Sequence, residues 1–441
     1  MADLEAWRAL VAKELAGAPF DKLVHKTPEG IAIDPLYTQR PQEAAFVRGA
    51  AQRWQLCMRS IDQTAELAGG ADLVWDGNDI DPDVITTLAF HDAGADAADE
   101  LALALSKLVA ALRAGRTPKM VRVAVGRDTF GEICKLRALR VVWHKVLAAA
   151  GIHGDFVIHA VCSSRTLSQR DPWVNMLRVT TQVFAAAIGG ASLITPQPFD
   201  QAFETHTPLG QRVARNTALV LREESQLGRV ADPAGGSFYI ETRTDALARE
   251  AWKRFGEIER EGGVDELARS GKLKLRLEAA WAAREAAIAK RKEPVLGVSE
   301  FANLREQLPG APVATLGHRD SEAFEALRAR FEKTPRSVSL VLLGPPTEHR
   351  ARVGFAENLF AVAGLDAKPG EAADIACLCG SDERYATEAA AKARELKAAG
   401  AKHVVLAGRP GALEQELRAA GVDAFIFVGC DVIATLEGLL S

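Results

Sequence analysis

Apolar residues recur along this chain in two alternating patterns. Short apolar runs bounded by Gly, Asp or Ser are typical of buried strands, and the segments between them carry apolar residues every three or four positions, as amphipathic helices do. The segment 98–115 is one such helix, with leucines along one face and a glycine at its end. Strand–helix alternation of this kind predicts parallel α/β structure. The candidate strands before residue 200 are 54–61, 71–75, 85–90, 120–126, 155–162 and 191–195.

These candidate strands are fewer than the eight that a closed (β/α)8 barrel needs. We therefore expect a shortened or incomplete (β/α)8-type barrel over residues 46–295. An N-terminal arm over residues 1–45 precedes it, with a helix at 3–16 and then a loop that prolines keep irregular. Further helices of the barrel region are predicted at 171–190, 244–260 and 272–292.

Residues 336–441 show the same alternation on a smaller scale, which predicts a flavodoxin-like, doubly wound domain. Such domains bind ligands at the carboxyl ends of their strands. Residues 296–335, rich in charge, Pro and Gly, are expected to link it to the barrel. Its predicted strands are 337–344, 374–380, 403–408 and 424–429, and its first helices are 350–363 and 384–399.

Composition narrows the functional classes. A net charge of -4 gives no indication of nucleic-acid binding, and an anionic ligand would need local arginines. The six cysteines lack the paired spacing of a zinc site, and Cys377 and Cys379 alternate as on one face of a strand. The N-terminus lacks the apolar core of a signal peptide, and no apolar stretch is long enough to cross a membrane. We expect a cytoplasmic protein without metal ligands.

Several stretches together resemble methylmalonyl-CoA mutase and its relatives, in the family's order. They cover most of residues 85–300 and include FGEICKLRALRVVWHKVL, RDPWVNMLRVTTQVFAAAIGGASLITPQPFDQA, RVARNTALVLREES and GRVADPAGGSFYIETRT. The variants DPAGGSFY, HRDSEAFEAL, LYTQRP and FVGCDVIATLEGLL resemble the family's small (beta) subunit. That subunit partners a catalytic large subunit in bacterial heterodimers. The resemblance implies a barrel followed by a cobalamin-binding domain, with the corrin held between them in active members.

Active members carry Asp-x-His-x-x-Gly after the first strand of the C-terminal domain. The His ligates cobalt, the Asp sets its tautomer, and the Gly lets the loop approach the cofactor closely. Here the first strand ends at Gly344 and His349 is present, but Thr347 stands at the Asp position and Arg352 at the Gly position. Glu348 replaces the Asp only if its side chain reaches the far ring nitrogen.

The predicted barrel also departs from the active pattern. The chain has three tyrosines, and none lies on a strand that resembles the family's substrate-facing one. His159 stands near the place of a CoA-binding arginine and is expected to be a hydrogen-bonded core residue. Ile194 replaces a cobalamin-facing histidine, whereas Glu224 matches a family position near the cofactor. We predict no catalytic residues; His349, Gly344 and Glu224 are the candidate cofactor-binding residues, and their role would be vestigial.

Three functions stay open on this basis. The first is a non-catalytic small subunit, without cofactor, that stabilises a catalytic large subunit in a heterodimer. The second is an active, adenosylcobalamin-dependent acyl-CoA isomerase with a divergent site, in which His349 would ligate cobalt. The third is a homodimeric scaffold or regulator. None of the three involves nucleic acid or a membrane.

Overall fold

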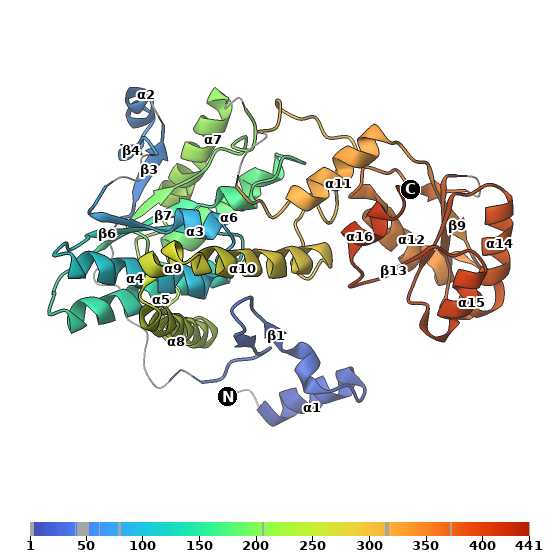
Figure 1. The fold of residues 1–441 in the computed structure, drawn as a ribbon, viewed down its shortest axis with the longest axis horizontal. Coiled ribbons are helices and arrows are strands. Elements are labelled where there is room, and N and C mark those ends of the chain that lie inside the picture. The colour runs from blue at the N-terminus through green and yellow to red at the C-terminus, as the bar shows by residue number, and fades with distance from the viewer. Residues whose placement is uncertain are drawn as a thin grey trace. The chain divides into compact units, whose positions relative to one another are not determined.

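The computed structural model describes residues 4–39, 41, 53–60, 62–77, 81–204, 207–313, 317–370 and 373–440 (Figure 1). These residues form two compact units. The first comprises residues 1–163, 179–197 and 214–280, and the second comprises residues 164–178, 198–213 and 281–441. The domain boundaries expected from the sequence stay predictions. None of the described helices is both long and apolar enough to span a membrane.

The first unit is built on a six-stranded parallel sheet in the order β4-β3-β8-β7-β6-β5. β4 and β5 follow one another in the sequence but lie at opposite edges of this sheet, whereas consecutive strands of a closed barrel are neighbours. No strand among the described residues joins those two edges, so the predicted incomplete barrel is confirmed. The strands are β3 (Gln55–Arg59), β4 (Leu73–Trp75), β5 (Val84–Thr86), β6 (Met120–Val125), β7 (Val157–Cys162) and β8 (Leu193–Thr195).

Helices cover this sheet, and side-chain caps fix where several of them begin. Asp96, Asp128 and Ser237 each accept a hydrogen bond from a backbone N–H three residues later, at the starts of α4, α5 and α8. α8 packs against both α4 and α5. The helices of the barrel region are α2 (Gln63–Ala68), α3 (Leu88–Asp92), α4 (Ala97–Arg113), α5 (Thr129–Ala149), α6 (Val174–Ile188), α7 (Pro208–Leu219), α8 (Phe238–Arg260), α9 (Val264–Arg269) and α10 (Lys272–Ala289), with the short 3-10 helix η2 (Ser164–Thr166) and the π-helix η3 (Val220–Glu224).

The N-terminal arm consists of a helix, a turn and a two-stranded hairpin. None of the residues of α1 is buried, although Trp7 packs edge-to-face on Phe20 with ring centroids 6.2 Å apart. The hairpin loop is held by Glu29, whose carboxylate accepts the N–H of Ala97 at 3.1 Å. The elements of the arm are α1 (Leu4–Leu15), η1 (Phe20–Leu23), β1 (His25–Lys26) and β2 (Ala32–Ile33).

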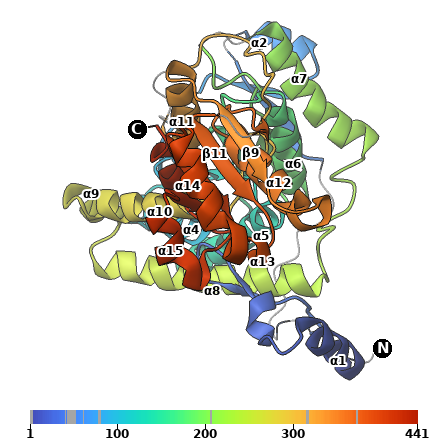
Figure 2. The same ribbon diagram turned by 90° about the vertical axis from the view of Figure 1, so that its right-hand side faces the viewer.

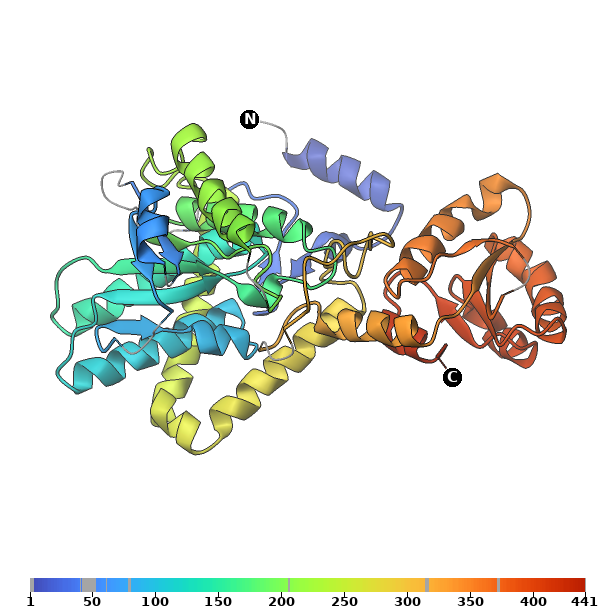
Figure 3. The ribbon, with the colours of Figure 1, turned by 90° about the horizontal axis from the view of Figure 1, so that it is seen from above.

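The second unit contains a five-stranded parallel sheet (Figures 2 and 3), in the order β10-β9-β11-β12-β13. Apolar clusters lie on both faces of this sheet. Cys377 and Cys379 join the cluster that α11, α12 and α16 cover, whereas Ala376 and Leu378 join the cluster that α14 and α15 cover. The two cysteines therefore share one face, as predicted. The elements are α11 (Glu322–Lys333), β9 (Val338–Leu342), α12 (Pro346–Ala361), β10 (Lys368–Pro369), β11 (Ile375–Cys379), α13 (Asp382–Arg384), η4 (Tyr385–Ala389), α14 (Ala390–Ala398), β12 (His403–Ala407), η5 (Gly411–Leu413), α15 (Glu414–Ala419), β13 (Ala424–Ile426) and α16 (Val432–Glu437).

Several predicted elements differ from the structure. The strand predicted at 85–90 ends at Thr86 and continues as α3. The helix predicted from residue 350 begins at Pro346, because proline is favoured in the first turn of a helix. The segment that was assigned to the linker contains α11, and β10 was missed because its two residues include a proline. The described part of the predicted strand 54–61 and the remaining barrel strands are confirmed.

Candidate functional site

The topology of the five-stranded sheet singles out one position for a ligand. The chain passes from β9 to β10 on one side and then returns to β11 on the other side of β9, so a crevice is expected at the carboxyl ends of β9 and β11. Gly344 follows β9, Gly380 follows β11 and Gly408 follows β12. We call these three ends the carboxyl edge. In a ligand-binding sheet of this type, the carboxyl edge leaves space for the ligand.

In this chain the side chain of Arg352 reaches the carboxyl edge from α12. Its Nη1 donates to the carbonyl oxygen of Ala407 at 2.8 Å, and its Nη2 donates to Asp382 Oδ1 at 2.5 Å. The guanidinium lies over the ring of Tyr385, 4.9 Å from the ring centroid. A Cβ atom placed on Gly408 would clash with Arg352 Nη1. Arg352 thus fills the space beside the end of β12.

Tyr385 provides the platform on which Arg352 lies. Its hydroxyl donates to the carbonyl oxygen of Ala407 at 2.7 Å and accepts the N–H of Gly380 at 3.0 Å. Burial raises the pKa of Tyr385, although the hydrogen bond from Gly380 and the charge of Arg352 oppose that shift. A neutral phenol that joins the ends of β11 and β12 is a structural brace.

A second group of charges covers the end of β9. Arg384 Nε lies 2.7 Å from Glu348 Oε2, and its Nη1 lies 2.6 Å from Glu388 Oε1. Gly344 has φ of 76°, and a Cβ atom on it would lie 2.6 Å from Glu348 Oε2. The positive φ favours glycine at this position, and the side chains of Glu348 and Arg384 lie close over it. Glu348 is thus engaged by Arg384, the last residue of α13.

His349 lies within α12, as the fourth residue of the helix, rather than in a loop. Its side chain is half-buried, and its Nδ1 atom is buried without a hydrogen-bond partner among the described residues. A cobalt-ligating histidine needs a partner on its second ring nitrogen to fix the tautomer. Across the residues that the structure describes, no three His, Cys, Asp or Glu side chains converge as a metal site.

Glu224 belongs to the first unit, whereas His349 and Gly344 belong to the second. It is the last residue of η3, and its side chain is exposed. Nearby Arg215, from the same sequence motif, forms an ion pair with Glu66 at 2.8 Å and braces α7 against α2.

Polar and aromatic side chains occupy the interior of the barrel-like sheet. His159 on β7 accepts a hydrogen bond from Arg122 Nε at 3.0 Å through Nδ1, and its Nε2 lies 2.8 Å from Thr195 Oγ1. The ring of Trp75 packs edge-to-face on His159, and the Arg122 guanidinium lies 4.0 Å from the Trp75 ring centroid. Burial and the charge of Arg122 lower the pKa of His159 to about 3. His159 is therefore a neutral, hydrogen-bonded core residue, as predicted.

A buried ion cluster lies between α4 and α5 and was missed by sequence reasoning. Lys135 is 1% exposed, and its Nζ lies 2.9 Å from Glu100 Oε2 and 2.6 Å from Glu132 Oε2. It also donates to the carbonyl oxygen of Ala124 at 2.8 Å. The available signal was a lysine on an otherwise apolar face in the segment ICKLRAL.

Comparison with known proteins identifies the family. The family profile described as "Methylmalonyl-CoA mutase" matches residues 78–342. This chain belongs to the methylmalonyl-CoA mutase family. The methylmalonyl-CoA mutase small subunit of Streptomyces virginiae is 40% identical over 396 residues, which cover 81% of this chain and 63% of that protein. The small subunit of Propionibacterium freudenreichii subsp. shermanii is 36% identical, over 80% of this chain and 61% of that protein.

The resemblance inferred from the sequence is therefore confirmed. The chain spans less than two thirds of the length of these small subunits. A methylmalonyl-CoA mutase of Cereibacter sphaeroides is 34% identical over 214 residues, which is 48% of this chain and 30% of that protein.

Proposed function

We propose that this chain is a non-catalytic, cytoplasmic member of the family, of the small-subunit type, which stabilises a catalytic large subunit and binds no cobalamin. Arg352 carries this proposal. Active members place glycine at the corresponding position, so that the loop approaches the cofactor. Here an arginine at that position occupies the carboxyl edge and bonds to Ala407 and Asp382.

The barrel supports the same proposal. Chemistry through a radical intermediate needs a closed cavity from which water is excluded. A sheet that is open between β4 and β5 does not close one, and Arg122, His159 and Trp75 fill part of its interior. We infer that these side chains stabilise the incomplete barrel in place of a bound acyl-CoA.

The outer face of α6 supports association with another chain. Trp173, immediately before α6, is 47% exposed, and Leu177 and Phe184 on α6 are 60% and 36% exposed. The helix contains one charged residue, Arg178, and that residue is buried. Surface helices normally show the reverse arrangement, with charges outside and apolar residues inside. An exposed apolar face of this kind is typical of an interface with another protein.

Titration with adenosylcobalamin or hydroxocobalamin, followed by absorbance, tests the loss of cofactor binding. We expect no saturable spectral change with the purified chain. A saturable complex whose cobalt–imidazole spectrum disappears in His349→Ala would overturn the proposal and favour the active isomerase.

Co-expression with a mutase large subunit from the same source tests the partner. Size-exclusion chromatography with light scattering is expected to show a heterodimer, and the partner's thermal midpoint is expected to rise in the complex. Leu177→Lys is expected to weaken the complex, whereas Leu275→Lys, at a similarly exposed leucine of α10, is expected to leave it intact. A stable homodimer that does not bind the large subunit would favour the scaffold function instead.

A further inference from the structure

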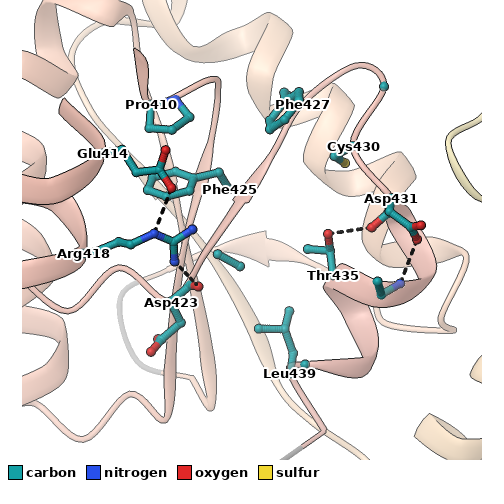
Figure 4. Close-up of a pocket in the computed structure, with 14 residues that line it drawn as sticks. Pro410, Glu414, Arg418, Asp423, Phe425, Phe427, Cys430, Asp431, Thr435 and Leu439 are labelled. Atoms are coloured by element: carbon teal, nitrogen blue, oxygen red, sulfur yellow. Dashed lines mark hydrogen bonds and ion pairs between the residues drawn. The ribbon is translucent and has the colours of Figure 1, made fainter. Parts of the chain in front are cut away.

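A groove runs along the free edge of the five-stranded sheet, beside β13 (Figure 4). Its volume is about 620 Å³, within the usual range of ligand sites. Arg418 and Phe425 lie on one side of it, and Asp431, Thr435 and Leu439 lie on the other. We call this feature the β13 groove. It is separate from Arg352 and Gly344, which do not line it.

The strand beside the groove has an unused hydrogen-bonding edge. Asp423 donates its backbone N–H to Val404 of β12 at 2.8 Å. Successive N–H groups of a strand point to opposite sides, so the N–H of Ala424 points away from β12. Ala424 lines the groove, and β13 is the last strand of the sheet among the described residues. An added strand would find donors and acceptors there.

The two edges of this sheet differ in how they are protected. The opposite edge strand, β10, consists of Lys368 and Pro369, and lysine and proline are the residues that commonly prevent edge pairing. β13 contains neither, and its sequence Ala-Phe-Ile suits a pleated, half-buried surface. Val428, two residues after the end of β13, is 78% exposed and extends the apolar surface. The β13 edge is thus the one left open to a partner.

The charged residues of the groove indicate which kind of ligand it would bind. Two of its charged residues are compensated within the chain: Arg418 pairs with Glu414 at 3.0 Å, and Asp423 pairs with Lys397 at 2.8 Å. Asp431 caps α16 by accepting the N–H of Ala434 at 2.9 Å, and it forms no ion pair with any described residue. A cationic side chain of a ligand would complement it.

We propose that the β13 groove binds an extended, basic peptide segment of another protein, which adds a strand to β13. The peptide's backbone pairs with the outward groups of Ala424 and Ile426. Alternate apolar side chains contact the groove wall at Phe425, and a Lys or Arg of the peptide reaches Asp431. This binding is independent of cobalamin and of the large subunit.

Fluorescence polarisation with two labelled, capped pentapeptides tests the proposal on the full chain. The probes are Lys-Val-Lys-Val-Lys and Glu-Val-Glu-Val-Glu. We expect saturable, salt-sensitive binding of the lysine peptide and about tenfold weaker binding of the glutamate peptide, because the unpaired charge in the groove is negative. Equal binding of the two peptides, or no saturable binding of either, would overturn the proposal.

Variants locate the binding. Ala424→Pro removes the outward N–H at a position where edge strands tolerate proline, and it is expected to weaken the lysine peptide about five- to tenfold. Ala424→Ser keeps the N–H and is expected to bind normally. Asp431→Asn keeps the helix cap and is expected to weaken binding about two- to fivefold.

A second blocking variant covers the case in which Ala424→Pro does not fold. Ala434 lines the groove from α16 and is exposed, so Ala434→Leu fills the groove without disturbing the core. We expect it to abolish binding while the thermal midpoint is retained. Unchanged peptide affinity in Ala434→Leu would refute the β13 groove as the binding site. The cobalamin titration tests only the proposed function, so its outcome does not affect this proposal.

Discussion

Lys135 offers a direct test of how the barrel-like unit is stabilised. The substitution Lys135→Met keeps the length and much of the volume of the side chain but removes its charge. It leaves Glu100 and Glu132 without their shared cation, in a place where Glu100 has no exposed surface. Glu100 retains hydrogen bonds from Thr87 Oγ1 at 2.7 Å and from the N–H of Ala124 at 3.1 Å. Glu132 therefore loses more of its stabilising interactions than Glu100 does.

The protonation of Glu132 determines how much stability is lost in Lys135→Met. Burial already raises the pKa of Glu132, despite Lys135, whereas for Glu100 burial is outweighed by Lys135 and His91, which lower its pKa. Without Lys135, Glu132 is expected to take up a proton. At pH 7 this costs about 3 kcal/mol, because each pH unit above its ordinary pKa costs about 1.4 kcal/mol. Breaking a buried ion pair costs about 3–5 kcal/mol in general, so we expect a loss of about that size.

The same reasoning predicts how the stability of Lys135→Met depends on pH. A carboxyl with a raised pKa binds a proton in the folded state that the unfolded state has released, so the variant loses stability as pH rises above about 4.5. Between pH 7 and pH 5 the difference from the unmodified chain is expected to narrow by about 2 kcal/mol.

Urea unfolding followed by circular dichroism at the two pH values measures this difference. Lys145→Met is the matched control, because Lys145 lies on the same helix, α5, and is exposed. It is expected to change stability by less than about 1 kcal/mol. If Lys135→Met and Lys145→Met destabilise equally, or if the loss does not shrink in acid, Lys135 does not hold the two carboxylates as argued.

Two further predictions concern single side chains in each unit. His159 is neutral in the folded state with a pKa of about 3, so protonation of the unfolded chain below pH 6.5 favours unfolding; stability should fall by about 2 kcal/mol between pH 7 and pH 5. In His159→Gln this part of the pH dependence should vanish, and an unchanged slope would contradict it. Gly354→Ala, in an open position of α12, should stabilise by about 0.4–1 kcal/mol, whereas Gly344→Ala should destabilise by about 1 kcal/mol or more, because φ is 76° and Glu348 lies too close. Thermal unfolding of the two alanine variants checks the sign of each change.

Periodicity predicted the regular part of the fold, and its failures have physical causes. Buried strands such as β7 and β11 are continuous apolar runs, so their type and position follow from hydrophobicity alone. β10 contains a proline and only two residues, and it pairs because β9 offers a free edge, which no local pattern reveals. α12 begins at Pro346, before the predicted start at residue 350, because a proline in the first turn is compatible with a helix.

The candidate site was only half predictable. The sequence showed that Thr347 and Arg352 replace the residues of the cobalamin motif. It did not show that Arg352 bonds to Ala407, because that contact joins residues separated by 55 positions and depends on the order of the strands. The pairing of Arg384 with Glu348 is equally non-local. The residue identities indicated that the cobalamin motif is lost. Only the fold shows which contacts of Arg352 and Arg384 take its place.

The two departures from the active family pattern differ in how readily they could be reversed. Arg352 is a single side chain, and Arg352→Gly would empty the end of β12 without restoring the Asp that Thr347 replaces. The open barrel is a change of topology: β4 and β5 remain far apart in the sheet although only eight residues, Asp76 to Asp83, separate them in sequence. No point substitution adds strands to that gap. If Arg352→Gly nevertheless gained cobalamin binding, the C-terminal unit would retain a cofactor fold that one side chain blocks. If it gained none, the missing Asp and the helical His349 would be sufficient to prevent binding on their own.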